Sequence, residues 1–73
     1  MTPIFADRLK ECRKSIGKTQ REVADALDIS ENGYQNYERN KNEPKMDTLI
    51  KFAEYFGVSI DYLTGLSDNP KRQ

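Results

Sequence analysis

Two helix-start signals that lie very close together constrain this chain more than any other feature of its sequence. Thr19 and Glu22 form the pattern of a capping box, in which each side chain bonds the other residue's backbone N–H. Ser30 is a second helix-capping residue, and only Asp28 and Ile29 separate it from the preceding helical pattern. Two helices joined by so tight a turn, with another helix packed before them, are typical of a helix-turn-helix.

The rest of the chain carries similar helix punctuation. Thr2 and Pro3 suit a helix start, and Gly17 suits the end of that helix. Ser59 and Gly65 bracket a very short helix in the same way. No segment alternates polar and apolar residues with period two, so strands are not expected. The sequence therefore predicts five helices, over residues 2–17, 19–29, 30–39, 46–57 and 59–65.

Apolar residues recur at helical spacing on one side of each predicted helix, and they are the expected core. Cys12 is expected there as a small buried hydrophobe. The chain end is polar, contains Pro70 and lacks periodicity, which is typical of a frayed end or the start of a linker. We therefore predict one domain over 1–66 and a flexible tail or linker over 67–73. The expected inward residues are Phe5, Leu9, Cys12, Ile16, Val23, Ala24, Leu27, Tyr34, Tyr37, Met46, Leu49, Phe52, Ala53 and Phe56.

Length and composition exclude several classes of protein. A chain of 73 residues is one domain near the lower size limit for a single core, without volume for a deep substrate pocket. The single cysteine excludes an internal disulfide and a Cys-rich zinc site, and the chain contains no histidine for catalysis or metal binding. No apolar run approaches a signal peptide or a membrane span. We expect a cytoplasmic domain that is not an enzyme and binds no cofactor, metal, membrane or small-molecule substrate.

The charge balance argues against simple electrostatic binding of nucleic acid. The 12 basic and 12 acidic residues cancel to a net charge of zero. A strongly basic chain would by itself indicate a nucleic-acid partner. If this chain binds DNA, the local placement of charge must supply the attraction, and its non-specific affinity is expected to be weak.

Residues 8–63 resemble the phage-repressor (Cro and Xre) helix-turn-helix family. The similarity rests on the stretches "RLK", "TQREVA", "DIS", "YERN" before "EPK", and "FGVSIDYLTG", which extend over nearly the whole domain. The resemblance implies an all-α, compact five-helix lambda-repressor-like DNA-binding domain, with the helix-turn-helix at about 19–39. It also implies a homodimer that binds double-stranded DNA at a palindromic operator.

Three positions depart from the pattern of this family. Lys18 stands where the family usually has a buried leucine or a similar residue. Asn40 replaces the usual glycine, although asparagine tolerates a left-handed backbone better than most residues. Gly33 stands where a small hydroxyl residue is common. The fold is expected to survive all three, with one core position less filled at Lys18.

The outer face of the second helix of the motif carries the candidate base contacts. Asparagine and glutamine can bind adenine through two hydrogen bonds, and a carboxylate can accept from cytosine N4. Glu31 also suits the positive end of the helix dipole without any DNA. Gly33 would allow close approach of the backbone to the groove, or is incidental, and the amides could be solvated polar residues only. The candidates are Asn32, Gln35, Asn36, Glu31 and Gly33.

The candidate phosphate contacts lie around the start of the motif and in the loop after it. Gln20 begins a helix, where free N–H groups favour an anion, and the resemblance places a phosphate-contacting glutamine there. The resemblance also implies that a basic residue after the proline enters the minor groove, which fits Lys45, although Glu43 opposes it. The candidates are Gln20, Lys18, Arg21, Lys41 and Lys45.

Two further sets of residues are assigned by resemblance alone. The family places an ion pair between the first and third helices at Arg13 and Glu38, which makes both residues structural rather than catalytic. It also uses the fifth helix in dimer contacts, and the expected dimer interface is Ile60, Tyr62 and Tyr55.

The leading hypothesis is a sequence-specific DNA-binding regulator, most simply a repressor that acts as a dimer. Its two recognition helices would enter successive major grooves about 34 Å apart. The alternative is a protein-interaction module of the same fold, such as an antitoxin-like partner or an adaptor with weak DNA binding. The acidic residues Glu31, Glu38 and Glu43 near the motif favour that alternative.

Overall fold

The computed structural model describes residues 3–71 and contains five helices connected by short turns and loops. No strand occurs among these residues, so the predicted all-helical architecture is confirmed. The expected cap at Thr2 lies outside the described residues. The helices are α1 (Pro3–Ser15), α2 (Gln20–Ala26), α3 (Glu31–Glu38), α4 (Met46–Phe56) and α5 (Ile60–Thr64).

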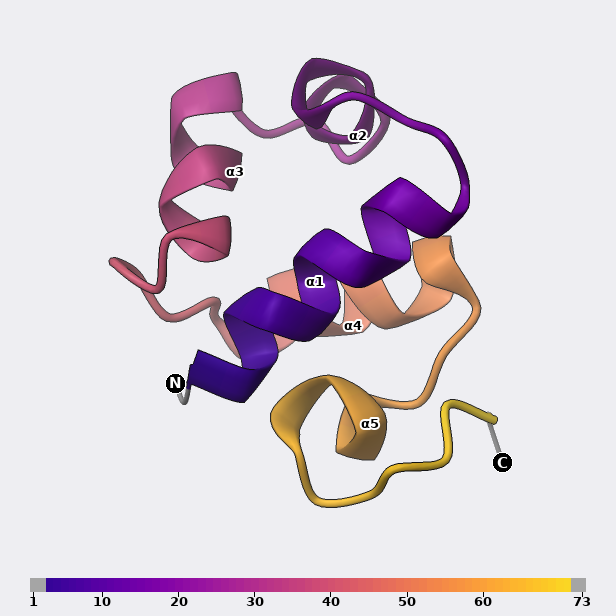
Figure 1. Cartoon of the computed structure of the whole chain (residues 1–73). Helices are drawn as coiled ribbons and strands as arrows, with labels where there is room; N and C mark the ends of the chain where they lie inside the picture. The colour runs from indigo at the N-terminus through magenta and orange to yellow at the C-terminus, as the bar shows by residue number, and fades with distance from the viewer. Residues whose placement is uncertain (1–2, 72–73) are drawn as a thin grey trace.

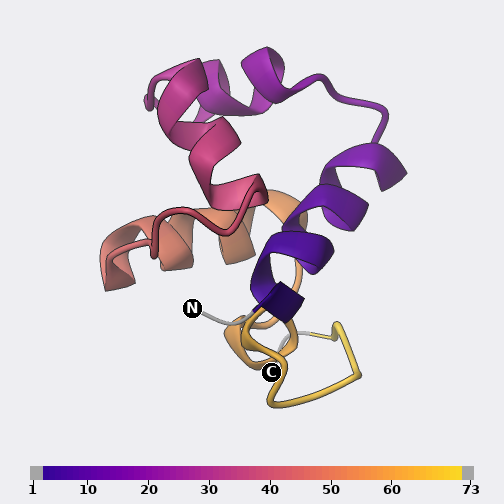
Figure 2. The same cartoon turned by 60° about the vertical axis from the view of Figure 1, so that its left-hand side comes forward.

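Helix α1 organises the fold by packing against three other helices. It contacts α3, α4 and α5, while α2 packs mainly on α3. Helices α2 and α3 lie at one end of the molecule, and α5 lies at the opposite end, as both views show (Figures 1 and 2). The helix-turn-helix therefore stands on the rest of the domain with its outer surface uncovered.

Aromatic rings fill the centre of the core. Phe52 of α4 is fully buried, and its ring centroid lies 6.2 Å from that of Phe5. Tyr34 and Tyr37 of α3 approach the Phe52 ring edge-on, at 5.9 and 5.6 Å between centroids. Aromatic pairs in such geometries contribute about 0.5–1.5 kcal/mol beyond the area they bury. The ring cluster thus fixes α3 against α4, and the prediction that Phe52 belongs to the core is confirmed.

Two expected core residues are exposed instead. Ile16 is 44% exposed, because α1 ends at Ser15 and the chain reverses at Gly17, which has a φ of 69°. Met46 is 65% exposed, because it is the first residue of α4, whose first turn projects from the body of the domain (Figure 2). The prediction that these two residues belong to the core is wrong, because each lies at a helix end beyond the packing partners.

Two tight turns near the motif use a left-handed backbone at residues other than glycine. Asn40, after α3, has a φ of 59°, which confirms that asparagine supports this turn. Asp28 has the same φ of 59° and closes the turn between α2 and α3. The left-handed conformation of Asp28 was not predicted, although aspartate is among the residues that tolerate it.

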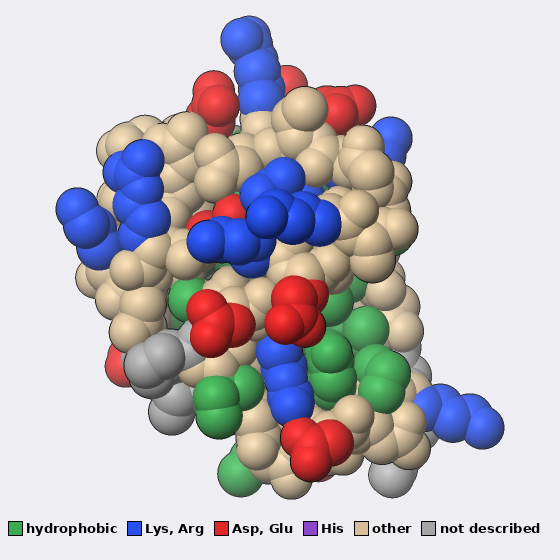
Figure 3. Space-filling model, viewed as in Figure 1, with side chains coloured by type: hydrophobic (Ala, Val, Ile, Leu, Met, Phe, Trp, Pro, Cys, Tyr) green, Lys and Arg blue, Asp and Glu red, His purple; other side chains and the backbone are tan. Residues whose placement is uncertain are grey.

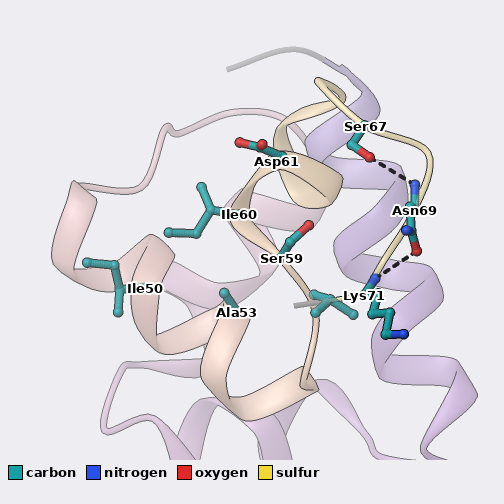
Figure 4. Close-up of a pocket in the computed structure, with 9 residues that line it drawn as sticks. Ile50, Ala53, Ser59, Ile60, Asp61, Ser67, Asn69 and Lys71 are labelled. Carbon is teal, nitrogen blue, oxygen red and sulfur yellow. Dashed lines mark hydrogen bonds between the residues drawn. The ribbon is translucent and has the colours of Figure 1, made fainter. Parts of the chain in front are cut away.

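The segment after α5 folds back onto the domain. The guanidinium of Arg8 on α1 donates to the Ser67 carbonyl at 2.6 Å and to the Asp68 carboxylate at 2.7 Å. The Ser59 amide donates to the Pro70 carbonyl at 2.9 Å. Residues 67–71 thereby form one side of a cleft against α4 and α5 (Figure 4). The domain boundary expected after residue 66 stays a prediction, but this part of the segment contacts the domain.

Candidate nucleic-acid interface

Local capping builds the motif as its sequence predicts. The Thr19 hydroxyl accepts from the Glu22 amide at 3.1 Å, and the Glu22 carboxylate accepts from the Thr19 amide at 2.9 Å, so the capping box is confirmed. These bonds lower the pKa of Glu22. The Ser30 hydroxyl accepts from the Gly33 amide at 3.0 Å and caps α3. Both helices of the motif therefore begin where the sequence places them.

The outer face of α3 carries three amide side chains that make no hydrogen bond within residues 3–71. Asn32 is exposed, while Gln35 and Asn36 are half-buried, and all three lie opposite the buried Tyr34. Glu31 is exposed in the first turn of the same helix. Polar groups left open on a convex helix surface are available to bind the edges of bases.

Gly33 lies against the side chain that caps α3. A Cβ atom at this position would lie 2.9 Å from the Ser30 side-chain oxygen. That oxygen holds the start of α3, so a larger residue would have to displace the cap. The glycine is therefore explained by the cap itself, without any contact to DNA.

Glu38, at the end of α3, is the centre of a buried hydrogen-bond network. Arg13 of α1 donates to both of its carboxylate oxygens, at 2.7 and 3.2 Å, which confirms the expected ion pair. Gln20 of α2 donates to the same carboxylate at 3.0 Å. Arg13 also donates to the Lys18 carbonyl at 3.0 Å, in the loop before α2. One carboxylate thus joins α1, α2 and α3, and fixes the orientation of the motif.

The network perturbs the pKa values of its members. Burial acts to raise the pKa of Glu38, but the hydrogen bonds it accepts, led by those from Arg13, and the charge of Arg13 outweigh burial, so the pKa lies below the ordinary glutamate value. Burial, followed by the nearby Glu38 carboxylate, raises the pKa of Tyr34. The Tyr34 hydroxyl oxygen is buried and has no hydrogen-bond partner of normal geometry in the described part of the chain. Glu38 is therefore ionised and Tyr34 is neutral at neutral pH.

The side chains expected to contact phosphates differ in whether they already have a partner within the domain. Lys18 lies 4.0 Å from the Glu22 carboxylate, and Arg21 lies 3.9 Å from that of Asp25. These exposed pairs are weak, so both cations can exchange partners with little cost. Lys41 and Lys45 are exposed and form no ion pair among residues 3–71, and Gln20 keeps one amide N–H that Glu38 does not use.

Two lysines near the start of the motif were not among the predicted phosphate contacts. Lys10 and Lys14 border a shallow hollow between the end of α1 and the start of α2, together with Arg13, Lys18, Gln20 and Glu38. Their spacing along α1 was a usable signal, because residues four apart on a helix share one face. No comparable sequence pattern predicts the hydrogen bond from Gln20 to Glu38.

The residues expected at a dimer interface are all half-buried. The Tyr62 ring lies beneath the Arg8 guanidinium, 4.2 Å from its centroid, and the Tyr55 ring packs edge-on against Phe56. Ile60 lies in the cleft shown in Figure 4, which Ile50 of α4 also lines. The structure thus leaves part of each side chain accessible, with Tyr62 already engaged within the domain.

No helix in the described part of the chain is long and apolar enough to cross a membrane.

A capped, tightly turned helix pair, held on a four-residue polar network and presenting an amide-lined outer face, defines a helix-turn-helix domain. The chain belongs to the helix-turn-helix family, which it matches over residues 9–63, and its resemblance to the phage-repressor (Cro and Xre) type is confirmed.

Curated relatives share most of this chain. It is 45% identical over 65 residues to the HTH-type transcriptional regulator ImmR of Bacillus subtilis, a match that covers 89% of this chain and 51% of ImmR. It is 47% identical over 60 residues to the SPbeta prophage-derived regulator YonR of the same organism, covering 82% and 56% of the two chains. It is 42% identical over 59 residues to the cryptic phage CTXphi transcriptional repressor RstR of Vibrio cholerae, covering 81% and 53%. The chain spans about half the length of these relatives.

Proposed function

We propose that this protein is a sequence-specific DNA-binding transcriptional regulator of the cytoplasm, and most simply a repressor that binds a palindromic operator as a homodimer. The observation that carries the proposal is the outer face of α3. Its amide side chains have no partner within residues 3–71, while the opposite face is fixed by the core and by Glu38. A rigid helix with open amides is suited to reading the major groove.

The family and the relatives' names support a regulatory role. ImmR and YonR are named as regulators and RstR as a repressor, while a more distant relative from Enterococcus faecalis, BcrR, is named as an activator. A regulator that occupies a site overlapping a promoter represses by excluding the polymerase. Nothing in this family supports the enzyme class.

The contacts assigned by sequence retain their proposed roles. Asn32, Gln35 and Asn36 would read bases, with Glu31 and the backbone at Gly33 beside them. Phosphates would be held by Gln20, Lys18, Arg21, Lys41 and Lys45. The network explains how Gln20 is placed, because Glu38 orients its amide and leaves one N–H free to donate.

The dimer would use the α4–α5 end of the domain, through Ile60, Tyr62 and Tyr55. The exposed Ile50 beside Ile60 extends this apolar surface. Its position away from α2 and α3 would leave both recognition helices open (Figure 1).

Selection of bound duplexes from a random-sequence pool tests the function directly. We expect enrichment of a two-fold symmetric sequence whose half-sites lie about one helical turn apart. An enriched sequence without symmetry would refute the dimer but not the DNA-binding role. A folded protein that enriches nothing would refute the regulator and favour the interaction module. The burial of Glu38 already removes one of the acidic residues that supported that alternative.

Substitution of single amides tests the base contacts. Gln35→Ala or Asn36→Ala is each expected to cost about 1–3 kcal/mol on the selected operator and little on random DNA. Asn69→Ala removes the same kind of side chain beyond α5 and should leave both affinities unchanged. Equal losses on operator and random DNA would show that the amides do not read bases. The measurement is a titration of labelled duplex by fluorescence anisotropy.

A further inference from the structure

The hollow between α1 and α2 gathers positive side chains, two of which, Lys10 and Lys14, form no ion pair among residues 3–71. Lys10, Lys14 and Lys18 line it, and the ion pair of Arg13 with Glu38 forms part of its wall, beside Gln20. Figure 3 shows Lys and Arg side chains gathered over α1, with acidic side chains below them. The hollow adjoins Gln20, at which the proposed function places a phosphate.

The positive side chains form a stripe on one face of α1. Lys10 precedes Arg13 by three residues and Lys14 by four, and Gly17 follows them by four and three, which places all of them on one face, with Gly17 just beyond the helix end. The apolar stripe of the same helix, with Leu9 at its centre, faces the core. The basic stripe therefore points outward and leads along α1 toward the start of α2.

The acidic residue in the hollow does not cancel this charge. The Glu38 side chain is only 1% exposed, and Arg13 binds both of its oxygens while Gln20 binds one. Its negative charge is thus neutralised by Arg13 and screened from the hollow. Lys10 and Lys14 form no ion pair among residues 3–71, so their charges remain available.

We propose that Lys10 and Lys14 bind backbone phosphates of the DNA strand next to the phosphate at Gln20, so that the strand runs over the hollow along α1. This inference rests on the proposed function and extends the backbone contact from α2 onto α1. It also explains how a chain without net charge holds DNA, because its unpaired cations are concentrated beside the motif.

The same lysines have a purely structural explanation that makes a different prediction. Lys14 lies in the last turn of α1, where a cation stabilises the helix dipole. In that case its removal would lower the stability of the free domain without a specific effect on the salt dependence of DNA binding. Stability and salt dependence must therefore be measured on the same variants.

The test uses the double variant Lys10→Gln/Lys14→Gln and a matched control. Lys51→Gln removes one positive charge from α4. It is the control for the single variants Lys10→Gln and Lys14→Gln, which are measured beside the double variant. The affinity of each protein for the selected operator and for random duplex is measured between about 50 and 200 mM salt. Thermal unfolding is followed by circular dichroism in parallel.

Each protomer should lose two phosphate contacts, so the plot of log K against log salt should become less steep by about 1.8 per bound protomer, or about 3.6 for the proposed dimer. Near 100 mM salt, binding should weaken by about eightfold for each lysine removed from the complex. The loss should be equal on operator and random DNA, with unchanged thermal unfolding, and the control should match wild type. An unchanged slope, or a loss equal to that of the control, would overturn the phosphate contacts while leaving the proposed function intact. A folded wild-type protein that binds neither duplex would overturn both proposals.

Discussion

Replacing Glu38 by glutamine should destabilise the domain more than any other conservative change of a charged residue. The substitution keeps the size of the side chain but removes the charge that Arg13 contacts at 2.7 and 3.2 Å. It also places an amide N–H₂ group opposite N–H donors from Arg13 and Gln20, so at least one bond becomes a donor–donor conflict. The Arg13 guanidinium would remain in a largely buried place without its counter-charge.

The expected cost can be bounded from burial. Removing one partner of a buried ion pair costs about 3–5 kcal/mol. Arg13 is 13% exposed, so water can partly solvate it and the lower end, about 3 kcal/mol, is the better expectation. A domain of 73 residues has a total stability of only about 4–11 kcal/mol. Glu38→Gln should therefore lower the Tm by about 12–24 °C.

The loss of stability in Glu38→Gln should also change with pH, in a direction that follows from the pKa of Glu38. The pKa of Glu38 is lower in the folded state than its ordinary value of 4.5, so the folded state binds fewer protons at this site. Its stabilising effect is complete above that value and is lost as the pH falls through the lower folded pKa. Glutamine does not titrate. The stability difference between wild type and Glu38→Gln should thus shrink between pH 7 and about pH 3.

Urea denaturation followed by circular dichroism, at both pH values, measures these differences. Asp25→Asn is the matched control, because it makes the same chemical change in an exposed pair whose side chains are 77% and 74% exposed. The control should cost no more than about 0.5 kcal/mol. If Glu38→Gln also cost no more than that at neutral pH, or if its deficit grew on acidification, the structural role assigned to Glu38 would be wrong.

Two glycines give further predictions, each measured by urea denaturation. Gly33→Ala should be close to neutral, because a gain of about 1 kcal/mol in helix propensity is offset by displacement of the Ser30 cap, worth about as much. In a Ser30→Ala background the same change should stabilise by about 1 kcal/mol, and equal effects in both backgrounds would contradict the clash. Gly57→Ala should cost about 1–2 kcal/mol from its φ of 69° alone, since nothing lies within 4 Å of the added Cβ. A cost well above that range would indicate a steric contact that the structure does not contain.

The features that sequence predicted well are those encoded by neighbouring residues. A capping box, a serine cap and a glycine stop each depend on a few adjacent positions, and Thr19, Ser30 and Gly57 lie where those local rules place them. Helical periodicity likewise predicted most of the core. It failed at Ile16 and Met46, because periodicity reports which face a residue is on and not whether a partner extends that far.

The features that sequence could not predict join residues that are distant along the chain. Arg8 donates to the backbone carbonyl of Ser67. Every residue has such a carbonyl, so the residue type does not indicate which one Arg8 will bind. The bond from Gln20 to Glu38 joins the start of α2 to the end of α3, so it depends on the turn between these helices, where Asp28 has a left-handed backbone. The residue type is only a weak indicator of that conformation.

The ion pairs of the domain bear on how a chain of zero net charge could bind DNA. Arg13 uses its charge on Glu38 inside the domain, so the carboxylate nearest the hollow does not repel a phosphate. Lys18 and Arg21 lie near acidic partners only at about the limit of an ion pair, 4.0 and 3.9 Å, and exposed pairs of this kind are easily exchanged. The acidic residues that reduce the net charge to zero therefore do not cancel the positive charges that would face the DNA strand. Because the long-range electrostatic field of the whole molecule is small, such a protein should bind random DNA weakly. Its discrimination between operator and random sequences should rest on the amides of α3.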